Sequence, residues 1–326
     1  MHSIGDPLPM WQRSSTSKQP AKDLDSDFIY FGIMYIQTKT LIDEYESRLI
    51  LFSIIEPGHL GWSQEIQKLG ATRVLEAITQ GEYNPRTCES ILNRINHTNI
   101  DMLQSAVNSS DSEFIYPGHS KWPQQLDQLS NPPIGLIVKG DIKSLTQKSI
   151  AIIGTRDPSQ SGVRNARNFA TTFVGHNWHI VSGGAIGIDT AAHSAALKAG
   201  GKTVAVIASG VEVDYPSINS DLFKKICEQG ALVSEVMPHV RARQNRFLIR
   251  NRLIAAISCA TIVVEAAHRS GSIRTARDAA ELMRPVLAIP GPLESLTSEG
   301  CHRLISEHVA EIVVSAQDAV EFVGAN

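Results

Sequence analysis

The chain has 326 residues, long enough for two domains, and its 42% hydrophobic and 19% charged residues are ordinary for a globular protein in water. The four cysteines lie far apart without a CxxC pair, which argues against a disulfide scaffold and gives no zinc-site pattern. No apolar run approaches the roughly 18 residues of a membrane span, and the N-terminus lacks an export-signal layout. We therefore expect a cytoplasmic protein with no membrane segment, no metal and no cofactor.

Residues 1–22 are rich in Ser, Pro, Gln and Lys and lack apolar periodicity, so we expect a disordered tail there. Over residues 23–112 apolar residues recur at helical spacing, which predicts a small helical domain. This part of the chain carries more acidic than basic residues, and its Pro57-Gly58 turn has no Lys or Arg beside it. The helical domain is therefore expected to pack or to contact a partner rather than to grip DNA.

Residues 113–147 read as a Pro-rich connector that ends in a lead-in strand at Ile134 to Lys139. Tyr116 and Trp122 in this connector can stack on nucleic-acid bases or anchor the segment to the next domain. Anchoring is the favoured interpretation.

Residues 148–326 alternate short apolar runs with helical patterns, which predicts a doubly wound parallel sheet of six or seven strands. The first strand, Ser149 to Ile153, feeds a turn that contains Gly154, Thr155 and Arg156. A second strand, His179 to Val181, feeds the turn Ser182 to Gly187. The two turns should therefore lie side by side.

The later elements of this domain follow the same alternation. A basic loop is expected over Met237 to Arg246. Helices are expected at His193 to Ala199, Asp221 to Glu228, Asn251 to Ser258 and Ser272 to Met283.

Turns at the carboxyl ends of parallel strands bind ligands because helix N-termini there present unpaired N–H groups. Gly154 lets an anion approach the backbone, Thr155 and Ser182 offer hydroxyl donors, and Arg156 offers a fork for phosphate oxygens. The same residue types also serve as ordinary turn and cap residues. Both interpretations stay open at this point.

Arginine is concentrated between Arg241 and Arg284, where nine arginines face three acidic residues. Such a stretch is typical of a polyanion site, although arginines on helix faces are often simply solvated. Arg250, Asn251 and Arg252 are expected to open an apolar helix whose polar end faces the Gly154 turn. The later Ser270-Gly271-Ser272 turn repeats the strand, polar turn and helix layout.

A series of motifs runs in a fixed order along the chain: GTR, SGGAIGID with AAH, GGKTVAV, YP, RFLIRNRLIAA, VVEA with RSGS, AIPGP and GCHRLI. This ordered series, from about Phe114 to Val323, resembles the DprA (Smf) family of DNA-processing proteins. The resemblance implies an α/β fold: an extended Rossmann-like, doubly wound, mostly parallel sheet at 148–326, preceded by a small helical, SAM-like domain. Many members append a winged-helix domain, which we do not expect here because the sequence ends at Asn326.

The resemblance also implies a function. Members bind single-stranded DNA without sequence preference and protect it, load the RecA recombinase on it during DNA uptake, natural transformation and recombination, and form homodimers. The chain is accordingly expected to be a DNA-binding protein rather than an enzyme.

The motif positions that match the family's DNA- and phosphate-binding residues are its turn residues, one lysine and the arginine motif. They are Gly154, Thr155, Arg156, Ser182, Gly183, Gly184, Gly187, Lys202, Arg250, Asn251, Arg252, Ser270, Gly271 and Ser272. Ser217 and Ile186 stand where many members have a basic residue, so DNA affinity is expected either to be weaker or to rely more on Arg241, Arg243 and Arg246.

An enzyme remains the alternative. Related Rossmann-like phosphoribohydrolases bind a nucleotide and cleave its N-glycosidic bond, and Asp189, Glu265 and His193 are the residues that could serve such chemistry. Their PGGxGTxxE signature is missing here, and Asp189 and Glu265 can equally orient the arginines. A dinucleotide oxidoreductase is less favoured, because no GxGxxG follows the first strand.

Overall fold

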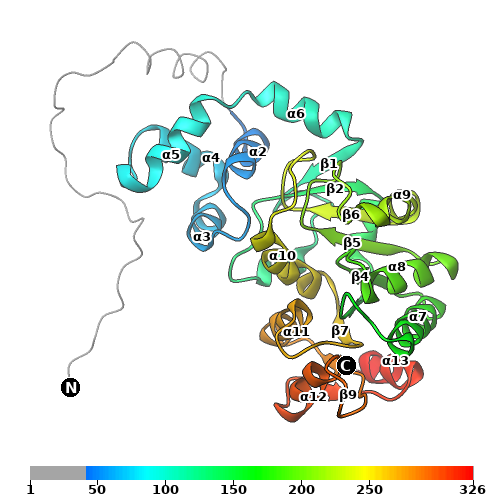
Figure 1. The fold of residues 1–326 in the computed structure, drawn as a ribbon. Coiled ribbons are helices and arrows are strands. Elements are labelled where there is room, and N and C mark those ends of the chain that lie inside the picture. The colour runs from blue at the N-terminus through cyan, green and yellow to red at the C-terminus, as the bar shows by residue number, and fades with distance from the viewer. Residues whose placement is uncertain (1–41, 326) are drawn as a thin grey trace, which may run out of the picture. The chain divides into compact units, whose positions relative to one another are not determined.

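The computed structural model describes residues 42–325, which divide into two compact units (Figure 1). The first unit holds residues 42–105 and 130–134, and the second holds 106–129 and 135–325. The tail expected at residues 1–22, and the expected start of the helical domain at residue 23, lie outside the described residues.

The first unit is helical, as the apolar spacing predicts. Its core is formed by fully buried side chains such as Leu49, Leu51 and Ile78. The last of its helices crosses into the second unit. The helices are α2 (Glu44–Ile54), α3 (Leu60–Leu69), α4 (Ala71–Thr79), α5 (Pro85–Asn96) and α6 (Ile100–Ser109).

Glu44 caps the start of α4, because the residue before that helix, Gly70, has no side chain to do so. Its carboxylate accepts hydrogen bonds from the N–H groups of Ala71 at 2.9 Å and Thr72 at 3.0 Å. Arg48 Nε lies 2.6 Å from the same carboxylate. Burial works against ionisation, but these hydrogen bonds and the arginine outweigh it and lower the pKa of Glu44.

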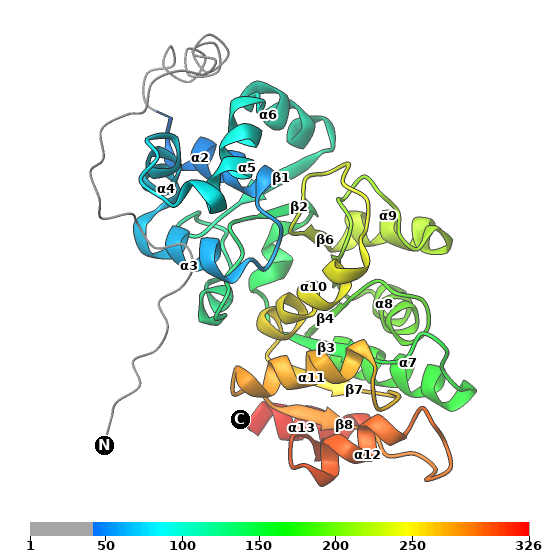
Figure 2. The same ribbon diagram turned by 60° about the vertical axis from the view of Figure 1, so that its left-hand side comes forward.

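The second unit is built on a nine-stranded sheet in the order β1-β2-β6-β5-β4-β3-β7-β8-β9 (Figure 2). Neighbouring strands from β6 through β9 in that order pair in parallel, whereas β1–β2 and β2–β6 are antiparallel. The expected mostly parallel, doubly wound fold is confirmed. The strands are β1 (Ser112–Ile115), β2 (Leu136–Gly140), β3 (Ser149–Ile153), β4 (His179–Ser182), β5 (Thr203–Ile207), β6 (Ala231–Ser234), β7 (Ala260–Val263), β8 (Val286–Ala288) and β9 (Glu311–Ile312).

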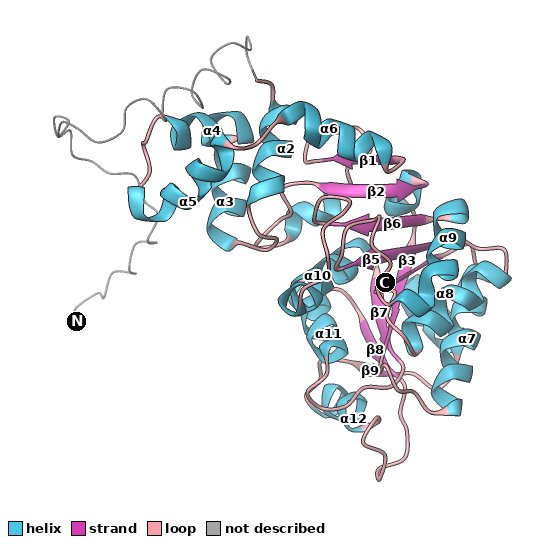
Figure 3. Cartoon of the chain, turned by 45° about the horizontal axis from the view of Figure 1, so that its top comes forward, coloured by secondary structure: helices cyan, strands magenta, loops and turns pink. Residues whose placement is uncertain are grey.

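Helices cover both faces of this sheet (Figure 3). Within β3, Ile150 and Ile152 join the core on one face, while Ala151 and Ile153 join the core on the other. A strand buried on both faces reads as a continuous apolar run, which is why the sequence pattern located it. One face carries α7 (Gln160–Gly175), α8 (Ile188–Lys198), α9 (Ser220–Gln229) and α13 (Ala316–Ala325); the other carries α10 (Gln244–Ile257), α11 (Gly271–Glu281) and α12 (Glu299–Ser306).

The segment at 113–147 is more than a connector. With Ser112 it forms the antiparallel pair β1–β2, so the sheet has more strands than the six or seven expected. Trp122 is buried in the core and donates from Nε1 to Asp127 at 2.9 Å, which confirms that it anchors this segment. Tyr116 stacks on Phe114 with ring centroids 5.9 Å apart.

Two helices begin earlier than the sequence indicated. The helix expected from His193 begins at Ile188, and the helix expected from Asn251 begins at Gln244. The short α12 was not expected at all. None of the helices within residues 42–325 is long and apolar enough to cross a membrane.

The order of the strands creates a switch point at β3. The chain winds from β3 through β4 and β5 to β6 on one side, then returns to β7 on the other side of β3. In open α/β sheets, ligands bind outside the carboxyl ends of the strands at such a point. We therefore expect a ligand site at the turns after β3 and β7.

Candidate functional site

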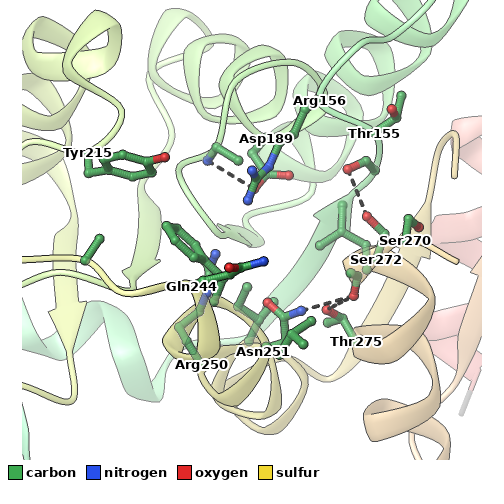
Figure 4. Close-up of a pocket in the computed structure, with 18 residues that line it drawn as sticks. Thr155, Arg156, Asp189, Tyr215, Gln244, Arg250, Asn251, Ser270, Ser272 and Thr275 are labelled. Carbon is green, nitrogen blue, oxygen red and sulfur yellow. Dashed lines mark hydrogen bonds between the residues drawn. The ribbon is translucent and has the colours of Figure 1, made fainter. Parts of the chain in front are cut away.

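A cavity of about 680 Å³ lies at this point, at the carboxyl edge of β3 (Figure 4). Its walls come from the turn after β3, from α10 and from the start of α11, with Tyr215 on a further side. The lining residues are Ile153, Gly154, Thr155, Arg156, Ala185, Asp189, Tyr215, Ala242, Gln244, Phe247, Leu248, Arg250, Asn251, Ile254, Ser270, Gly271, Ser272 and Thr275.

The turn after β3 is held on two sides. Thr155 donates its N–H to the carbonyl of Glu265 at 2.7 Å and accepts from the N–H of Ile188 at 3.2 Å. A Cβ on Gly154 would come within 2.6 Å of the Ile188 side chain and 2.9 Å of the Glu265 carbonyl, so only glycine fits this close approach. Arg156 is exposed beyond the turn, with its guanidinium 5.3 Å from the ring centroid of Phe247.

Arg250 enters the cavity from α10 and is only 7% exposed. One of its Nη atoms donates to the carbonyl of Val206, while its Nε has no hydrogen-bond partner among residues 42–325. Burial lowers the pKa of Arg250 to about 10, with Asp189 opposing and Arg156 adding to the decrease. The guanidinium stays charged at neutral pH and has an unsatisfied donor.

The start of α11 forms another wall, and side chains tie it in place. Asn251 Nδ2 donates to the carbonyl of Gly271 at 3.0 Å, and Ser272 Oγ donates to the carbonyl of Gly154 at 2.8 Å. Ser270 stands at the N-cap without making a cap hydrogen bond, and its hydroxyl oxygen is buried with no partner in the described chain. The first turn of α11 also lacks an acidic residue, so the N–H groups and the positive end of the helix dipole meet no capping carboxylate of that helix.

Two acidic residues hold the neighbouring turns. Asp189 accepts from the N–H groups of Gly183 at 3.1 Å and Ala185 at 3.2 Å, and burial raises its pKa against the influence of Arg250 and these donors. Glu265 accepts from the N–H of Ser159 at 2.9 Å at the start of α7. The expectation that Glu265 orients Arg250 or Arg252 is wrong. That Asp189 orients Arg250 stays a prediction.

The cavity brings together Gly154, Thr155 and Arg156 with Arg250, Asn251 and the turn at Ser270, Gly271 and Ser272. Of the binding residues expected from the sequence, these are the ones that line the same cavity.

The turn after β4 contributes Ala185 to the cavity lining, but the residues expected from it, Ser182, Gly183, Gly184 and Gly187, do not line the cavity. Ser182 is buried and donates its hydroxyl to the carbonyl of Ile152 at 2.7 Å, and the N–H of Gly183 is taken by Asp189. Gly184 is also buried, and Gly187, at φ +87°, lies against the carbonyl of Thr155. These residues therefore pack beneath the β3 turn and hold it in place, and they do not offer hydrogen-bond donors to a ligand in the cavity.

Three basic residues are also placed elsewhere. Lys202 lies 2.6 Å from Asp141, and Arg246 donates to the carbonyl of Arg241 at 3.1 Å. Arg252 is buried and forms two hydrogen bonds, of 2.8 and 2.7 Å, with the carboxylate of Glu235. The arginine motif does not open a helix as expected, because α10 begins six residues before Arg250.

Sequence reasoning missed the aromatic wall of the cavity. Tyr215 and Phe247 lie with ring centroids 5.4 Å apart and planes tilted by 50°. Gln244, Phe247 and Asn251 are spaced i, i+3 and i+7, which places them on one face once the helix is known to begin at Gln244. That spacing is the signal that could have found them.

The acids and histidine of the enzyme alternative do not form a set in the cavity. His193 is fully buried away from the lining, with Nδ1 2.7 Å from the hydroxyl of Thr203. Burial lowers the pKa of His193 to about 3. Of the three residues considered, only Asp189 lines the cavity.

Curated relatives share much of this chain. Two Mycobacterium tuberculosis proteins are 45% identical over 183 residues, which is 56% of this chain and 47% of theirs. The chain thus spans about half the length of these relatives. DNA processing protein DprA of Streptococcus pneumoniae is 40% identical over 199 residues, covering 61% of this chain and 70% of that protein.

Solved structures agree with the fold. DNA processing protein A from Streptococcus pneumoniae has a TM-score of 0.74 at 30% identity and covers 86% of this chain and 98% of its own. The protein of that name from Helicobacter pylori, whose structure is described for its single-stranded DNA binding mode, has a TM-score of 0.59 at 29% identity over 66% and 96%. Residues 113–324 match the family described as DNA recombination-mediator protein A. With this match over more than half its length, the chain belongs to that family, the DprA (Smf) family.

Proposed function

We propose that the chain binds single-stranded DNA without sequence preference, with a backbone phosphate held in the cavity by Arg156, Arg250 and the start of α11. One observation carries the proposal: the buried Nε of Arg250 has no partner within residues 42–325 and belongs to a residue that lines the same cavity as the uncapped start of α11. A buried charged donor without a partner is costly, and a bound anion would satisfy it. Phosphate contacts of this kind position a strand without reading its sequence.

The residues proposed to contact or support the phosphate are those that converge on the cavity. They are Gly154, Thr155, Arg156, Arg250, Asn251, Ser270, Gly271 and Ser272. Arg252, Lys202 and the turn after β4 support the fold in this proposal, since each has its own internal partners.

The broader role proposed is DNA processing in natural transformation and recombination: the protein would act in the cytoplasm as a homodimer, protect the strand and load RecA on it. The names of the relatives as DNA processing proteins, and the description of the family as a recombination mediator, support this role. We propose a binding protein and not an enzyme, since the residues considered for hydrolysis do not converge in the cavity.

The salt dependence of DNA binding tests the site. Each phosphate neutralised contributes about −0.7 to the slope of log affinity against log salt for single strands. Arg156→Ala should weaken binding of every sequence alike and make the slope shallower by about 0.7. Arg303→Ala is the matched control, because Arg303 lies on α12 outside the cavity with its side chain 50% exposed. An unchanged slope in Arg156→Ala would contradict the proposal.

Homodimer formation and RecA loading are tested by separate measurements. Light scattering should give twice the monomer mass at tens of micromolar protein. RecA strand exchange on DNA coated with single-strand binding protein should speed up when this protein is added. No acceleration with DNA binding intact would remove the loading role and leave a protective one.

A further inference from the structure

The amino edge of the parallel sheet, at the other end of the strands from the cavity, carries basic side chains on three neighbouring strands. Lys148 and Lys202 directly precede β3 and β5, and His179 is the first residue of β4, which lies between them. The N–H of His179 donates to the carbonyl of Lys148 at 2.9 Å, and the N–H of Ile180 donates to that of Lys202 at 3.2 Å. Because neighbouring strands lie about 4.8 Å apart, the two lysines leave the backbone about 10 Å from each other.

Two further segments add positive charge at this edge. Lys143 belongs to the short 3-10 helix η2 (Ile142–Thr146), whose Ser144 carbonyl lies 3.4 Å from Nδ1 of His179, and Lys198 stands in the last turn of α8. Residues 141–148, 176–179 and 198–202 together contain four lysines and two histidines against one acidic residue. We refer to Lys143, Lys148, Lys198 and Lys202 as the amino-edge cluster.

Most of this charge is not used inside the chain. Lys202 Nζ lies 2.6 Å from the carboxylate of Asp141, and this hydrogen bond lowers the pKa of Asp141. The other three lysines of the cluster are exposed, and none forms an ion pair with another residue of 42–325. A lysine in the last turn of a helix complements the helix dipole, which accounts for Lys198. Lys143 and Lys148 lie outside the α-helices, so the dipole does not account for them.

Lys148 is held in place at the surface. Its Nζ lies 4.1 Å from the ring centroid of Trp178, which is 5% exposed and packs edge-on against Phe173 with centroids 5.4 Å apart. A cation–π attraction of this kind keeps the ammonium over the ring. A partner that binds an already ordered side chain loses less conformational entropy.

The chemistry of the cluster favours carboxylates over nucleic acid. Its segments contain lysine but no arginine, so they offer point charges and not the planar fork that matches phosphate oxygens. Sites for single-stranded nucleic acid also present aromatic rings on which bases stack. The one such ring in these segments, Trp178, is buried beneath Lys148. An extended peptide repeats its side chains on one face about every 6.8 Å, a spacing that flexible lysines on this edge can follow.

We propose that the amino-edge cluster docks an acidic, extended segment of a partner protein, whose carboxylates pair with Lys143 and Lys148 and are flanked by Lys198 and Lys202. The strands β3, β4 and β5 have four or five residues each, so the two edges of the sheet lie about 13–17 Å apart. The cluster shares no residue with the cavity. A partner docked there leaves the cavity open, and the inference does not depend on the proposed function.

The test titrates the full-length protein into a fluorescently labelled oligoglutamate peptide at about 10 mM salt, where the screening length is about 30 Å. Oligoglutamine of the same length is the neutral control and should not bind. An exposed ion pair is worth about 1.5- to 5-fold in affinity, so Lys143→Gln/Lys148→Gln should weaken oligoglutamate binding by about 2- to 25-fold. Lys143→Arg/Lys148→Arg keeps both charges and should keep the affinity. Lys224→Gln/Lys225→Gln removes the same charge from exposed positions on α9 and should leave the affinity nearly unchanged.

A second measurement uses a labelled thymidine oligonucleotide with the same variants. Its affinity and salt slope should be the same in Lys143→Gln/Lys148→Gln as in wild type. A slope shallower by about 0.7–1.4 in that variant would identify a nucleic-acid surface and overturn the inference. Absence of saturable oligoglutamate binding, or equal losses in the two glutamine variants, overturns it as well and leaves a solvated basic patch. Failure of the oligonucleotide to bind wild-type protein contradicts the proposed function instead, so the two failures are distinguishable.

Discussion

Removing one member of the buried ion pair between Arg252 and Glu235 should destabilise the second unit more than removing both. The side chains are 8% and 9% exposed and share two hydrogen bonds of 2.8 and 2.7 Å. Breaking such a pair leaves a buried charge without its counter-ion and costs about 3–5 kcal/mol, whereas replacing both members by apolar residues is often neutral. Arg252→Met and Glu235→Leu should each cost that much alone, and the double variant should regain most of it.

Urea unfolding followed by far-ultraviolet circular dichroism measures these changes. With a slope near 2 kcal/mol per molar urea, each single substitution should lower the midpoint of the second unit by roughly 1.5–2.5 M. The helical first unit contains neither residue, so its transition is an internal control. Additive single costs, with no recovery in the double variant, would refute the pairing argument.

The same double variant tests whether Arg252 contacts DNA. If the arginine serves only the ion pair, the salt slope of single-strand binding should stay at the wild-type value. A slope shallower by about 0.7, as expected for Arg156→Ala, would show that Arg252 does neutralise a phosphate.

Three further changes probe other parts of the structure. Burial lowers the pKa of His193 from 6.5 to about 3, so between these pH values the unfolded chain takes up a proton that the folded chain does not. The free energy of unfolding should therefore fall by about 2 kcal/mol from pH 7 to pH 5. Urea midpoints of His193→Gln should lose this pH dependence. The lowered pKa of Glu44 stabilises the first unit above about pH 4.5 and ceases to do so as the carboxylate is protonated, so thermal melts of Glu44→Gln should show less acid sensitivity than wild type. A Cβ on Gly183 would overlap the guanidinium of Arg250, so Gly183→Ala should weaken single-strand binding in mobility shifts; unchanged affinity would show that Arg250 is not needed where it lies.

The parallel strands could be located from sequence because they are buried on both faces. Runs such as Ser149–Ile153 are apolar throughout and end in glycine turns, and both signals are local. β1 was missed because it is a four-residue edge strand whose partner lies about twenty residues away. Its residues carry no local pattern that marks them as paired.

The start of α10 was missed for a different reason. Arg243 at its N-cap makes no side-chain cap hydrogen bond, and the first turn contains no acidic residue, so the usual start signals are missing. The arginines there resembled a solvated basic loop. Arg241 and Arg243 are indeed exposed, but Arg252 further along α10 is buried against Glu235, which lies on a different element and which no local pattern reveals.

The candidate site was only partly predictable from residue types. Gly154, Thr155 and Arg156 were located because a small polar turn after the first strand is a local feature. The turn after β4 has equally suitable residues, but the N–H groups of Gly183 and Ala185 are already taken by Asp189, from the first turn of the next helix. A sequence shows which hydrogen-bond donors are present. It does not show which of them already bond an acceptor within the folded chain.

The carboxylates of Asp189 and Glu265 accept hydrogen bonds from backbone N–H groups of the turn after β4 and of the start of α7. Donors that already bond a carboxylate of the chain are not open to an anion from outside. The start of α11 differs, because it has no side-chain cap hydrogen bond and no acidic residue in its first turn. The chain thus uses its own carboxylates to direct an added anion to one of three chemically similar places.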